Sequence, residues 1–594
     1  MKILLATLHA RYVHSSLALP CLAASCMGLD GIETVIREFT VNEPYDDTLH
    51  RLAAEQADIA AFSCYIWNIE PTLKLAADLK KVIPDTVIVL GGPEAGYGGF
   101  ELMERNRGLD IIVRGEGEET FRELAAALLR SRPTLQLCNS ATLQLLQDID
   151  GLVFRSGEEI IATPDRPSID LDRIPSPFSL GFIDMGKPLV YYETSRGCPF
   201  SCAFCMSSLE KGVRSFSPER IEADLRQLIA GGVRTVKLVD RTFNYDAVRA
   251  DRIWEFIRAE NRGSSFHFEI AADLLTEENF RLLEKIPPAT FRFEIGLQSE
   301  NEQTLSRVGR HSDLTRLSAN VRRLIETTGI TVHLDLLAGL PHEDYEGFLD
   351  SLQKVFDLLS PNNPYAFDRQ GGSPFIQVEV LKVLKGSPMR TIARDEGYSF
   401  SDTPPYKILR TPWLSFVDIG RIEAISRLID LYFNSGRFTA TLARLARSGP
   451  LARFFDRFVE SRGLSSHDAD RSLAGLFGSL WSYGEMFLGG VERELLREAL
   501  CYDYCLAEYP SASGLPRFFQ GSVPEAAQGS PGEKPADLAR RLGIAKGCRV
   551  RSFSMRFARD PRQPDDGREA VLRFVYASAP GKGLKVLVEE KDRG

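Results

Sequence analysis

The sequence has neither a long apolar run nor an excess of positive charge. No stretch approaches the roughly 18 uninterrupted apolar residues of a membrane-spanning helix, so we expect no membrane span. The 72 Lys and Arg residues are outnumbered by 81 Asp and Glu residues. General nucleic-acid binding requires a basic surface, so we expect no nucleic-acid partner. The apolar run at 3–8 is too short for a signal peptide, and we therefore expect a cytoplasmic protein.

The sequence also lacks the cysteine pattern of a disulfide-bonded secreted domain. Its ten cysteines include three within eight residues, Cys198, Cys202 and Cys205, in a Cys-x3-Cys-x2-Cys pattern directly after a predicted strand. Thiolates bind iron–sulfur clusters, and a compact loop of this kind reaches three corners of a cubane. No fourth cysteine lies nearby, so one iron of such a cluster would keep an open coordination position.

A structural zinc site is the alternative interpretation of these three cysteines. Structural zinc takes four protein ligands, typically in paired spacing, and no partner pair is visible. Cys501 and Cys505 are also three residues apart, but at positions i and i+4 they are predicted to be two core positions of one helix. The pattern therefore favours the iron–sulfur cluster.

The fold class predicted from the first part of the chain is α/β. Short apolar runs alternate with helical patterns, which indicates a parallel sheet with helices on both faces and a Rossmann-like domain over 1–135. A connector with a β-hairpin follows at 136–188. The predicted strands of the first domain are 2–8, 33–41, 58–66, 87–90 and 111–113, and a helix is predicted at 118–129.

A second series of alternating elements predicts a partial barrel of six β-α units over 189–400. Beyond it we predict a helical domain at 401–509, a linker rich in Pro, Gly and Ser at 510–535, and a small α+β module at 536–594. The predicted barrel strands are 189–193, 235–239, 266–271, 290–296, 331–337 and 375–381.

Glycines follow two strands of the first domain, at Gly91-Gly92 and at Gly115. Ligands of a doubly wound sheet bind beyond the carboxyl ends of the strands, and glycines there let a bulky ligand approach the backbone. No Gly-x-Gly-x-x-Gly opens the first helix, which disfavours a dinucleotide.

The segment Arg196–Cys205 resembles the signature loop of the radical S-adenosylmethionine (SAM) superfamily. The resemblance implies a catalytic [4Fe–4S] cluster on Cys198, Cys202 and Cys205. It also implies that S-adenosyl-L-methionine binds the open iron and is cleaved reductively to a 5′-deoxyadenosyl radical. Phe204 matches the aromatic residue that contacts the adenine in that family.

Later barrel segments resemble the cobalamin-type branch of the same family. Phe293–Ser299 is similar to its fourth strand, Leu337–Pro341 to the turn after its fifth, and Leu384–Pro388 to the end of its sixth. The second strand departs from the family, since Val239–Asn244 replaces a Gly-Gly-Glu type sequence. The residues predicted to bind SAM are Phe204, Asp240, Glu269, Gln298 and Arg310.

The first domain resembles the cobalamin-binding domain of this branch, called class B, in its loops 63–68, 90–94 and 114–118. No histidine has an aspartate two residues before it, so the Asp-x-His-x-x-Gly motif is missing and we expect no protein histidine on cobalt. Trp67 is predicted either to cap the lower face of cobalamin or to anchor the core. The residues predicted to bind cobalamin are Ser63, Tyr65, Trp67, Gly91, Gly92, Gly115 and Glu116.

Polar residues alternate with apolar ones along several barrel strands. Glu269, Glu294 and Gln298 are therefore predicted to face either the barrel interior or solvent. His333 and Asp335 share one strand face, where they serve either as acid and base near the substrate or as a packed pair.

The whole layout resembles a bacterial subfamily whose C-terminal domain has no assigned function. The first functional hypothesis is methylation of an unactivated carbon through methylcobalamin and a 5′-deoxyadenosyl radical. The alternatives are cobalamin-assisted ring contraction or oxidative cyclisation, and a SAM or cobalamin sensor without catalysis. The expected partners are an unidentified small-molecule or peptide substrate and an electron donor such as flavodoxin or ferredoxin.

Overall fold

The computed structural model describes residues 1–131, 139–210, 212–359, 374–463, 472–511, 515–519, 534–545, 547–562, 567–579 and 582–590. The chain forms two compact units. The first unit comprises Met1–Asp344 and Val380–Phe416, and the second comprises Tyr345–Glu379 and Val417–Gly594. Among the described helices, none is both long and apolar enough for a membrane span.

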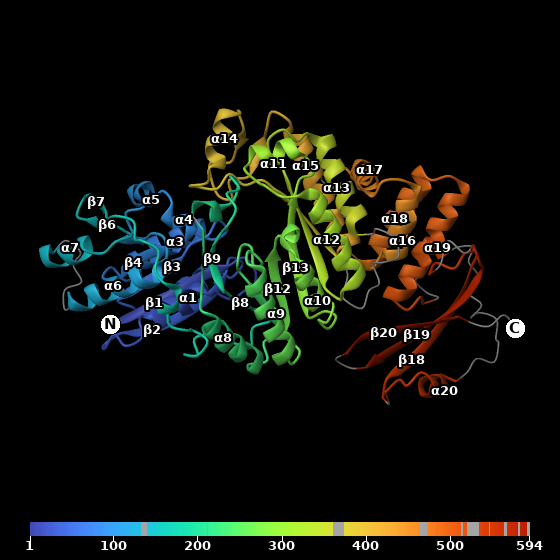
Figure 1. The fold of residues 1–594 in the computed structure, drawn as a ribbon, viewed down its shortest axis with the longest axis horizontal. Coiled ribbons are helices and arrows are strands. Elements are labelled where there is room, and N and C mark those ends of the chain that lie inside the picture. Colours follow the sequence, from blue (N-terminus) through green and yellow to red (C-terminus); the bar gives the residue numbers. More distant parts are fainter. Residues whose placement is uncertain are drawn as a thin grey trace. The chain divides into compact units, whose positions relative to one another are not determined.

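The first unit opens with a seven-stranded sheet in the order β2-β1-β3-β4-β5-β6-β7 (Figure 1). Its first five strands are parallel, as the sequence predicts. These strands are β1 (Lys2–His9), β2 (Glu33–Thr40), β3 (Ile59–Ser63), β4 (Val87–Gly91) and β5 (Ile111–Val113). The connecting helices are α1 (Ala18–Ser25), α2 (Tyr45–Ala54), α3 (Ile69–Val82), α4 (Pro93–Gly96), α5 (Gly99–Arg105), α6 (Gly117–Arg130) and α7 (Ser140–Gln147).

Burial on both faces explains why the inner strands β1, β3, β4 and β5 are nearly continuous apolar runs, whereas the edge strand β2 is mixed. Along β1, Leu4 and Ala6 join one core cluster, whereas Ile3 and Leu5 join a second. Parallel sheets covered by helices on both faces need apolar residues at every strand position, and successive side chains alternate between the two cores. The strand order reverses direction around β1 and β3, which is where ligands of such sheets bind.

The hairpin predicted within the connector is part of the first sheet. Strands β6 (Leu152–Ser156) and β7 (Glu159–Ala162) are antiparallel, and β6 pairs with β5, with Ile111 opposite Phe154. Val153 and Phe154 are buried, and the pairing covers the edge of β5 that would otherwise expose unpaired backbone groups.

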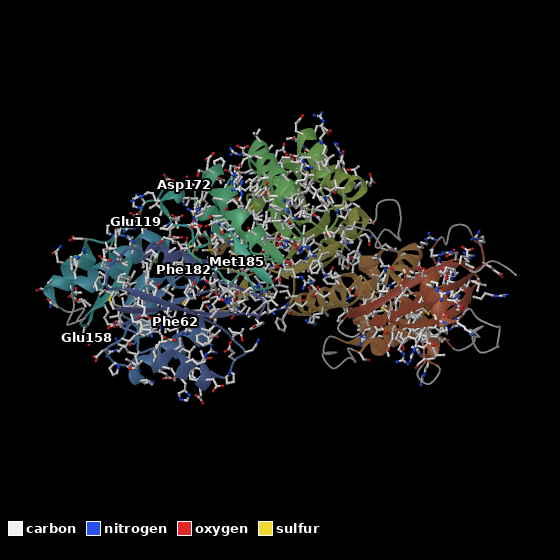
Figure 2. The ribbon with its side chains drawn as sticks, turned by 90° about the horizontal axis from the view of Figure 1, so that it is seen from below. Phe62, Glu119, Glu158, Asp172, Phe182 and Met185 are labelled. Atoms are coloured by element: carbon white, nitrogen blue, oxygen red, sulfur yellow. The ribbon has the colours of Figure 1, made fainter. Side chains whose placement is uncertain are left out.

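The rest of the connector contacts both domains of the first unit. Arg173 forms an ion pair with Glu119 of α6 at 2.9 Å, and Asp172 accepts a hydrogen bond from the Ser217 backbone N–H (Figure 2). Phe182 packs against the core cluster that contains Ile3 and Leu5. The connector is therefore held by contacts at several points along its length.

The barrel sheet of the first unit has the parallel order β14-β13-β12-β11-β8. Its strands are β8 (Leu189–Tyr192), β11 (Thr235–Leu238), β12 (Ser265–Ile270), β13 (Phe291–Gln298) and β14 (Thr331–Ala338). Its helices are α8 (Pro218–Ala230), α9 (Ala247–Glu260), α10 (Glu277–Leu283), α11 (Glu302–Arg307) and α12 (Leu314–Thr327). Phe268 and Phe293 lie on the outer face and pack on Trp254 of α9, so the polar residues between them face the barrel interior.

The predicted sixth strand is β15 (Phe375–Val380). Just after it the Leu381 N–H donates to the carbonyl of Ala338 at the end of β14. The predicted α/β fold class with a partial barrel is confirmed. The first unit then continues through α14 (Met389–Asp395), β16 (Ser399–Phe400) and β17 (Ile408–Arg410).

The second unit is mainly helical and ends in an antiparallel sheet, as predicted. Its helices are α13 (Tyr345–Leu359), α15 (Phe416–Leu428) with a π-helical turn at Ile429–Phe433, α16 (Thr439–Ser448), α17 (Leu451–Arg462), α18 (Leu473–Phe487), α19 (Gly490–Ala507) and α20 (Pro535–Arg541). Its sheet has the order β18 (Arg549–Phe557), β19 (Ala570–Ala579) and β20 (Lys582–Glu590). Cys501 and Cys505 are buried core positions of α19, as expected. Most of the predicted linker 510–535 lies outside the described residues.

Candidate functional site

The three cysteines lie on a hairpin and loop that follow the first barrel strand. Strand β9 (Ser195–Cys198) pairs with β10 (Gly212–Ser215), with Cys198 opposite Gly212. Gly197 has a φ of +89°, and a Cβ atom there would collide with the carbonyl oxygen of Gly212. Only glycine fits at this position, so the tight turn that presents Cys198 depends on it.

Backbone hydrogen bonds connect the cysteine loop to later parts of the barrel. The Ala203 N–H donates to the Val308 carbonyl at 2.8 Å, and the Met389 N–H donates to the Ala203 carbonyl at 3.0 Å. Met389 begins α14, and Val308 follows α11. The two hydrogen bonds therefore join the loop to α14 and to the segment after α11.

Each of the first two cysteines has a polar neighbour. The Cys198 sulfur lies 3.3 Å from the Thr242 hydroxyl, and a guanidinium nitrogen of Arg310 lies 3.8 Å from the Cys202 sulfur. Burial raises the pKa of the Cys202 thiol, and the Arg310 charge opposes that rise. Three free cysteines with a cation beside them fit the thiolate ligands that a cluster requires.

Arg310 and Gln298 meet at the end of β13, close to Cys202. Arg310 donates to the Gly296 carbonyl, and a Cβ atom on Gly296 would collide with the Gln298 amide nitrogen. The pairing of β13 with β14 shifts register here, and Gln298 takes a φ of +71°. The structure therefore gathers two residues predicted to bind SAM beside the cluster loop, where half-buried Phe204 also lies.

Asp240 occupies a different environment from the other residues predicted to bind SAM. Its side chain is fully buried, and its oxygens accept hydrogen bonds from the backbone and hydroxyl of Thr194, from the Ser195 hydroxyl and from Arg249. These contacts fix the segment that leads into Cys198. The geometry gives Asp240 a positioning role and leaves it no exposed oxygen.

A cluster of ionisable side chains lines the interior face of the barrel strands, and we call it the lumen cluster. Lys237 lies 2.9 Å from Glu294 Oε2 and 3.7 Å from Glu269 Oε1. His267 Nε2 lies 2.8 Å from the same Glu294 oxygen. The lumen cluster consists of Lys237, His267, Glu269, Glu294, His333 and Asp335.

The carboxyl groups of the lumen cluster have different proton affinities. Burial raises the pKa of Glu269 to about 7. Burial acts in the same direction on Glu294, but His267 and Lys237 outweigh it and hold its pKa well below the usual range. His333 Nε2 lies 3.0 Å from Asp335 Oδ1. The interior is therefore charged and polar, which suits a polar ligand.

The predicted cobalamin loop after β3 carries two stacked aromatic rings. Tyr65 and Trp67 lie 4.5 Å apart at an angle of 4°, and the Trp67 indole N–H donates to the Leu8 carbonyl at 3.2 Å. The Trp67 side chain is 46% exposed, and Tyr65 stacks on one face of its ring. Ser63, at the end of β3, is buried beneath this loop, and its carbonyl accepts a hydrogen bond from Thr7.

The glycines of the other two loops serve different purposes. A Cβ atom on Gly92 would lie 2.7 Å from the Cys64 carbonyl oxygen, so backbone packing alone requires this glycine. A Cβ atom on Gly115, where φ is +71°, would meet nothing within 4 Å, and one on Gly91 would make only ordinary contacts with Val113. Gly91 and Gly115 therefore leave room at the carboxyl edge of the sheet for a bulky ligand.

Acidic residues of the third predicted cobalamin loop, 114–118, form ion pairs with arginines of the cysteine hairpin. Arg196 lies 2.5 Å from Glu118, 3.5 Å from Glu116 and 3.0 Å from Glu193, and Arg214 forms an ion pair with Glu116. We call this group the interdomain ion-pair cluster. Burial raises the pKa of Glu193 to about 7, whereas Arg196 keeps the pKa of Glu118 low despite burial. The Glu116 side chain is thus engaged with the barrel.

Sequence reasoning missed several of these residues. Lys237 and His267 alternate with buried apolar neighbours, so the strand period of two could have found them. His14 lies 2.7 Å from the Tyr191 hydroxyl, and Arg196 reaches a residue 78 positions away. Such long-range partners leave no local signal in the sequence.

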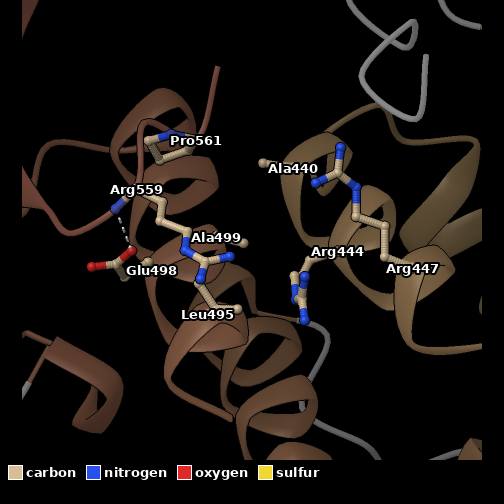
Figure 3. A pocket seen from close by; sticks show the side chains of 8 residues that line it. All are labelled: Ala440, Arg444, Arg447, Leu495, Glu498, Ala499, Arg559 and Pro561. Carbon is tan, nitrogen blue, oxygen red and sulfur yellow. Dashed lines mark hydrogen bonds between the residues drawn. The ribbon is translucent and has the colours of Figure 1, made fainter. Parts of the chain in front are cut away.

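The second unit has a pocket of its own with a different character (Figure 3). Arg444 and Arg447 line one side of it, and Arg559 and Glu498 line the other, where Glu498 accepts a hydrogen bond from the Arg559 backbone N–H at 3.3 Å. Arg444 is paired with Glu492. None of the residues predicted to bind a cofactor lines this pocket.

Three family models match separate parts of the chain. The model described as "B12 binding domain" matches residues 3–125, and the model described as "Radical SAM superfamily" matches residues 192–355. The model described as "Protein of unknown function (DUF4080)" matches residues 395–529.

Relatives and solved structures agree with these matches. The chain is 26% identical over 389 residues to a 2-(S-pantetheinyl)-carbapenam-3-carboxylate methyltransferase of Streptantibioticus cattleyicolor, covering 60% of this chain and 51% of that protein. It is 28% identical to an anaerobic magnesium-protoporphyrin IX monomethyl ester cyclase of Synechocystis sp., covering 60% of this chain and 71% of that protein. The radical SAM methyltransferase TsrM of Kitasatospora setae, solved with cobalamin and a [4Fe-4S] cluster, has a TM-score of 0.55 at 16% identity, covering 78% of this chain and 99% of that one.

The fold and the matches define a protein with a B12-binding domain in front of a radical SAM domain. The chain therefore carries a B12-binding domain, a radical SAM domain and a DUF4080 domain in that order, and this combination is similar to the cobalamin-dependent radical SAM proteins named above. The predicted cofactor set of cobalamin, SAM and a [4Fe–4S] cluster is confirmed at the level of these domains. The chain spans about half the length of the methyltransferase relative, at 51%.

Proposed function

We propose that the protein is a cobalamin-dependent methyltransferase that methylates an unactivated carbon. One observation carries the proposal: the interdomain ion-pair cluster joins the third glycine loop of the B12-binding domain directly to the cysteine hairpin of the barrel. A reaction that uses both cofactors requires them to face a common space, and this contact supports that placement. The name of the methyltransferase relative points the same way.

The residues divide into three proposed roles. Cys198, Cys202 and Cys205 hold the cluster. Phe204, Gln298 and Arg310 contact SAM, Glu269 faces the same interior, and Asp240 positions the loop. Ser63, Tyr65, Trp67, Gly91, Gly92, Gly115 and Glu116 shape the cobalamin site, with Gly92 and Glu116 acting through backbone packing and ion pairs.

When bound, the cluster supplies the electron for reductive SAM cleavage, and cobalamin carries the methyl group. The protein contributes geometry and charge. Arg310 stabilises the thiolate of Cys202 and offers a guanidinium group to a carboxylate, while exposed Trp67 offers a flat apolar surface to the corrin ring. Among the described residues, the loops that carry Trp67, Gly91 and Gly115 contain no histidine, in keeping with the missing Asp-x-His-x-x-Gly motif.

The products formed from SAM test the proposal. Methyl transfer consumes two SAM molecules per turnover, so S-adenosylhomocysteine and 5′-deoxyadenosine should rise together, near one to one. Anaerobically reconstituted protein is incubated with SAM, a reductant and extracts of the native host as the source of substrate, and both products are measured by mass spectrometry. Sustained 5′-deoxyadenosine without S-adenosylhomocysteine would rule out methyl transfer.

The cyclase relative favours a second candidate, a cobalamin-assisted cyclisation or ring contraction without methylation. That reaction predicts 5′-deoxyadenosine alone in the same assay, and a sensor predicts neither product above background. The electron donor, a flavodoxin or ferredoxin, is part of the same proposal. Replacing the chemical reductant with either protein should support product formation.

A further inference from the structure

Three metal-binding side chains meet inside the barrel, apart from the cysteine loop. His267 on β12, Glu294 on β13 and His333 on β14 each offer one ligand atom, and these atoms lie within 4.8 Å of one another. Glu294 is opposite His333 in the register of β13 and β14, and on β12 it is opposite Glu269, which follows His267 by two residues on the same face of the strand. Neighbouring strands are about 4.8 Å apart, so the sheet itself brings these side chains together.

We propose that His267, Glu294 and His333 bind one divalent transition-metal ion of the zinc or iron(II) class. Two imidazoles and one carboxylate on one side of an ion form a facial set that suits these metals and leaves positions open for water or an oxygen or nitrogen of a ligand. The three side chains are only 14%, 15% and 6% exposed, so the ligand atoms are sheltered from bulk water.

The surroundings of the three ligands fit such a site. Asp335 lies 3.0 Å from His333, as carboxylates often do to orient a histidine ligand. Glu294 Oε2 lies 2.8 Å from His267 Nε2 and 2.9 Å from Lys237 Nζ, so one carboxylate oxygen already brings an imidazole and a cation together. Lys237 has a second carboxylate, Glu269, at 3.7 Å and can turn to it when Glu294 binds an ion.

The charge balance of the lumen cluster also favours a bound cation. The lumen cluster contains three carboxyl groups and one ammonium group, that of Lys237, and Arg241 acts on Glu269 from outside the cluster. Buried carboxylates need cationic partners or hydrogen-bond donors. A cationic amine on a substrate is the competing occupant, and the metal is favoured because both imidazoles approach the same carboxylate from either side.

Zinc binding by the holoprotein tests the proposal. Protein loaded with cluster and cobalamin is dialysed anaerobically against chelator-buffered zinc, and bound zinc is measured by mass spectrometry. We expect one zinc per chain, and we expect His267→Ala and His333→Ala each to weaken its binding at least tenfold. His50→Ala, which removes an exposed histidine from α2, should change nothing. No zinc above background, or full retention in both lumen variants, would overturn the site.

Two further variants separate metal binding from a hydrogen-bond network. Glu294→Gln keeps the shape of the side chain and should abolish zinc binding while the cluster iron stays at the wild-type level, which also reports correct folding. Lys237→Met removes the competing ammonium and should tighten zinc binding about tenfold, whereas weaker binding would contradict the proposal. X-ray absorption at the zinc edge should show nitrogen and oxygen ligands, and sulfur ligation would assign the ion to the cysteines instead. The inference does not depend on methyl transfer.

Discussion

At the scale of single residues, the site depends on a glycine that no side chain can replace. Gly197 is opposite Val213 and Gly212 is opposite Cys198 in the cysteine hairpin, and both glycines have positive φ angles. A Cβ atom on Gly197 would strike the Gly212 carbonyl, whereas one on Gly212 would meet nothing within 4 Å. Alanine at Gly197 would therefore add both a steric collision and backbone strain. Alanine at Gly212 would add backbone strain alone, so it serves as the control.

We expect Gly197→Ala to lower cluster incorporation by more than half, because the hairpin must open to make room for the alanine side chain. Gly212→Ala should cost about 1 kcal/mol of backbone strain and leave the iron content nearly unchanged. Iron analysis and the visible absorption of anaerobically reconstituted protein measure the difference. Equal iron content in the two variants would show that the close approach at Gly197 does not hold the cysteines in place.

At the scale of elements, a buried carboxylate of α19 caps another helix of the second unit. Asp503 accepts hydrogen bonds from the backbone N–H groups of Ala440 and Thr441 and from the Thr441 hydroxyl, at the start of α16. Burial raises the pKa of Asp503 to about 7, although these hydrogen bonds oppose the rise. The folded chain thus retains a proton that the unfolded chain loses near an ordinary aspartate pKa of about 4.

This difference predicts the pH dependence of the second unit. Between about pH 4 and pH 7 the folded state binds more protons at Asp503, so its contribution to the free energy of unfolding falls as pH rises and levels off above pH 7. The asparagine in Asp503→Asn cannot ionise, so this variant should lose the pH-dependent fall in the free energy of unfolding. In the wild-type protein that fall is roughly 1 kcal/mol per pH unit. Urea denaturation across this range measures it, with Asp537→Asn on α20 as an exposed control. Parallel pH profiles for wild type and Asp503→Asn would contradict the assignment.

At the scale of the whole molecule, Arg196 links the two sheets of the first unit. Its guanidinium group lies among Glu116, Glu118 and Glu193, and the side chains of Arg196 and Glu118 are only 13% and 10% exposed. Removing one partner of a buried ion pair leaves a charge without compensation, which costs far more than losing an exposed pair.

We expect Arg196→Met to lower the free energy of unfolding of the first unit by about 3 kcal/mol. Arg258→Met, which removes an exposed pair with Glu255 on α9, should have a much smaller effect, because exposed ion pairs contribute little to stability. Denaturant unfolding of the two variants gives the comparison. If the two losses match, the interdomain ion-pair cluster contributes no more than a surface contact.

Much of the first unit could be predicted because its elements have local signatures. The strand that contains Ile3–Leu8 is buried on both faces, and its unbroken apolar run identified it. The spacing of Cys198, Cys202 and Cys205 identified the cluster loop in the same way. The prediction was weaker for Asp240, whose role depends on donors from Thr194 and Arg249 that no spacing rule connects.

The sequence by itself determined the order of the elements, the cysteine loop and the glycines at the strand ends, because each follows from the periodicity or conformational freedom of neighbouring residues. Only the tertiary structure decided which side chains meet. It added the hairpin β6–β7 to the first sheet, engaged Glu116 with Arg214, and brought His267, Glu294 and His333 to one point. The physical reason is that these contacts join residues far apart in the chain, and their energies come from burial and charge compensation that arise only when the sheets have formed.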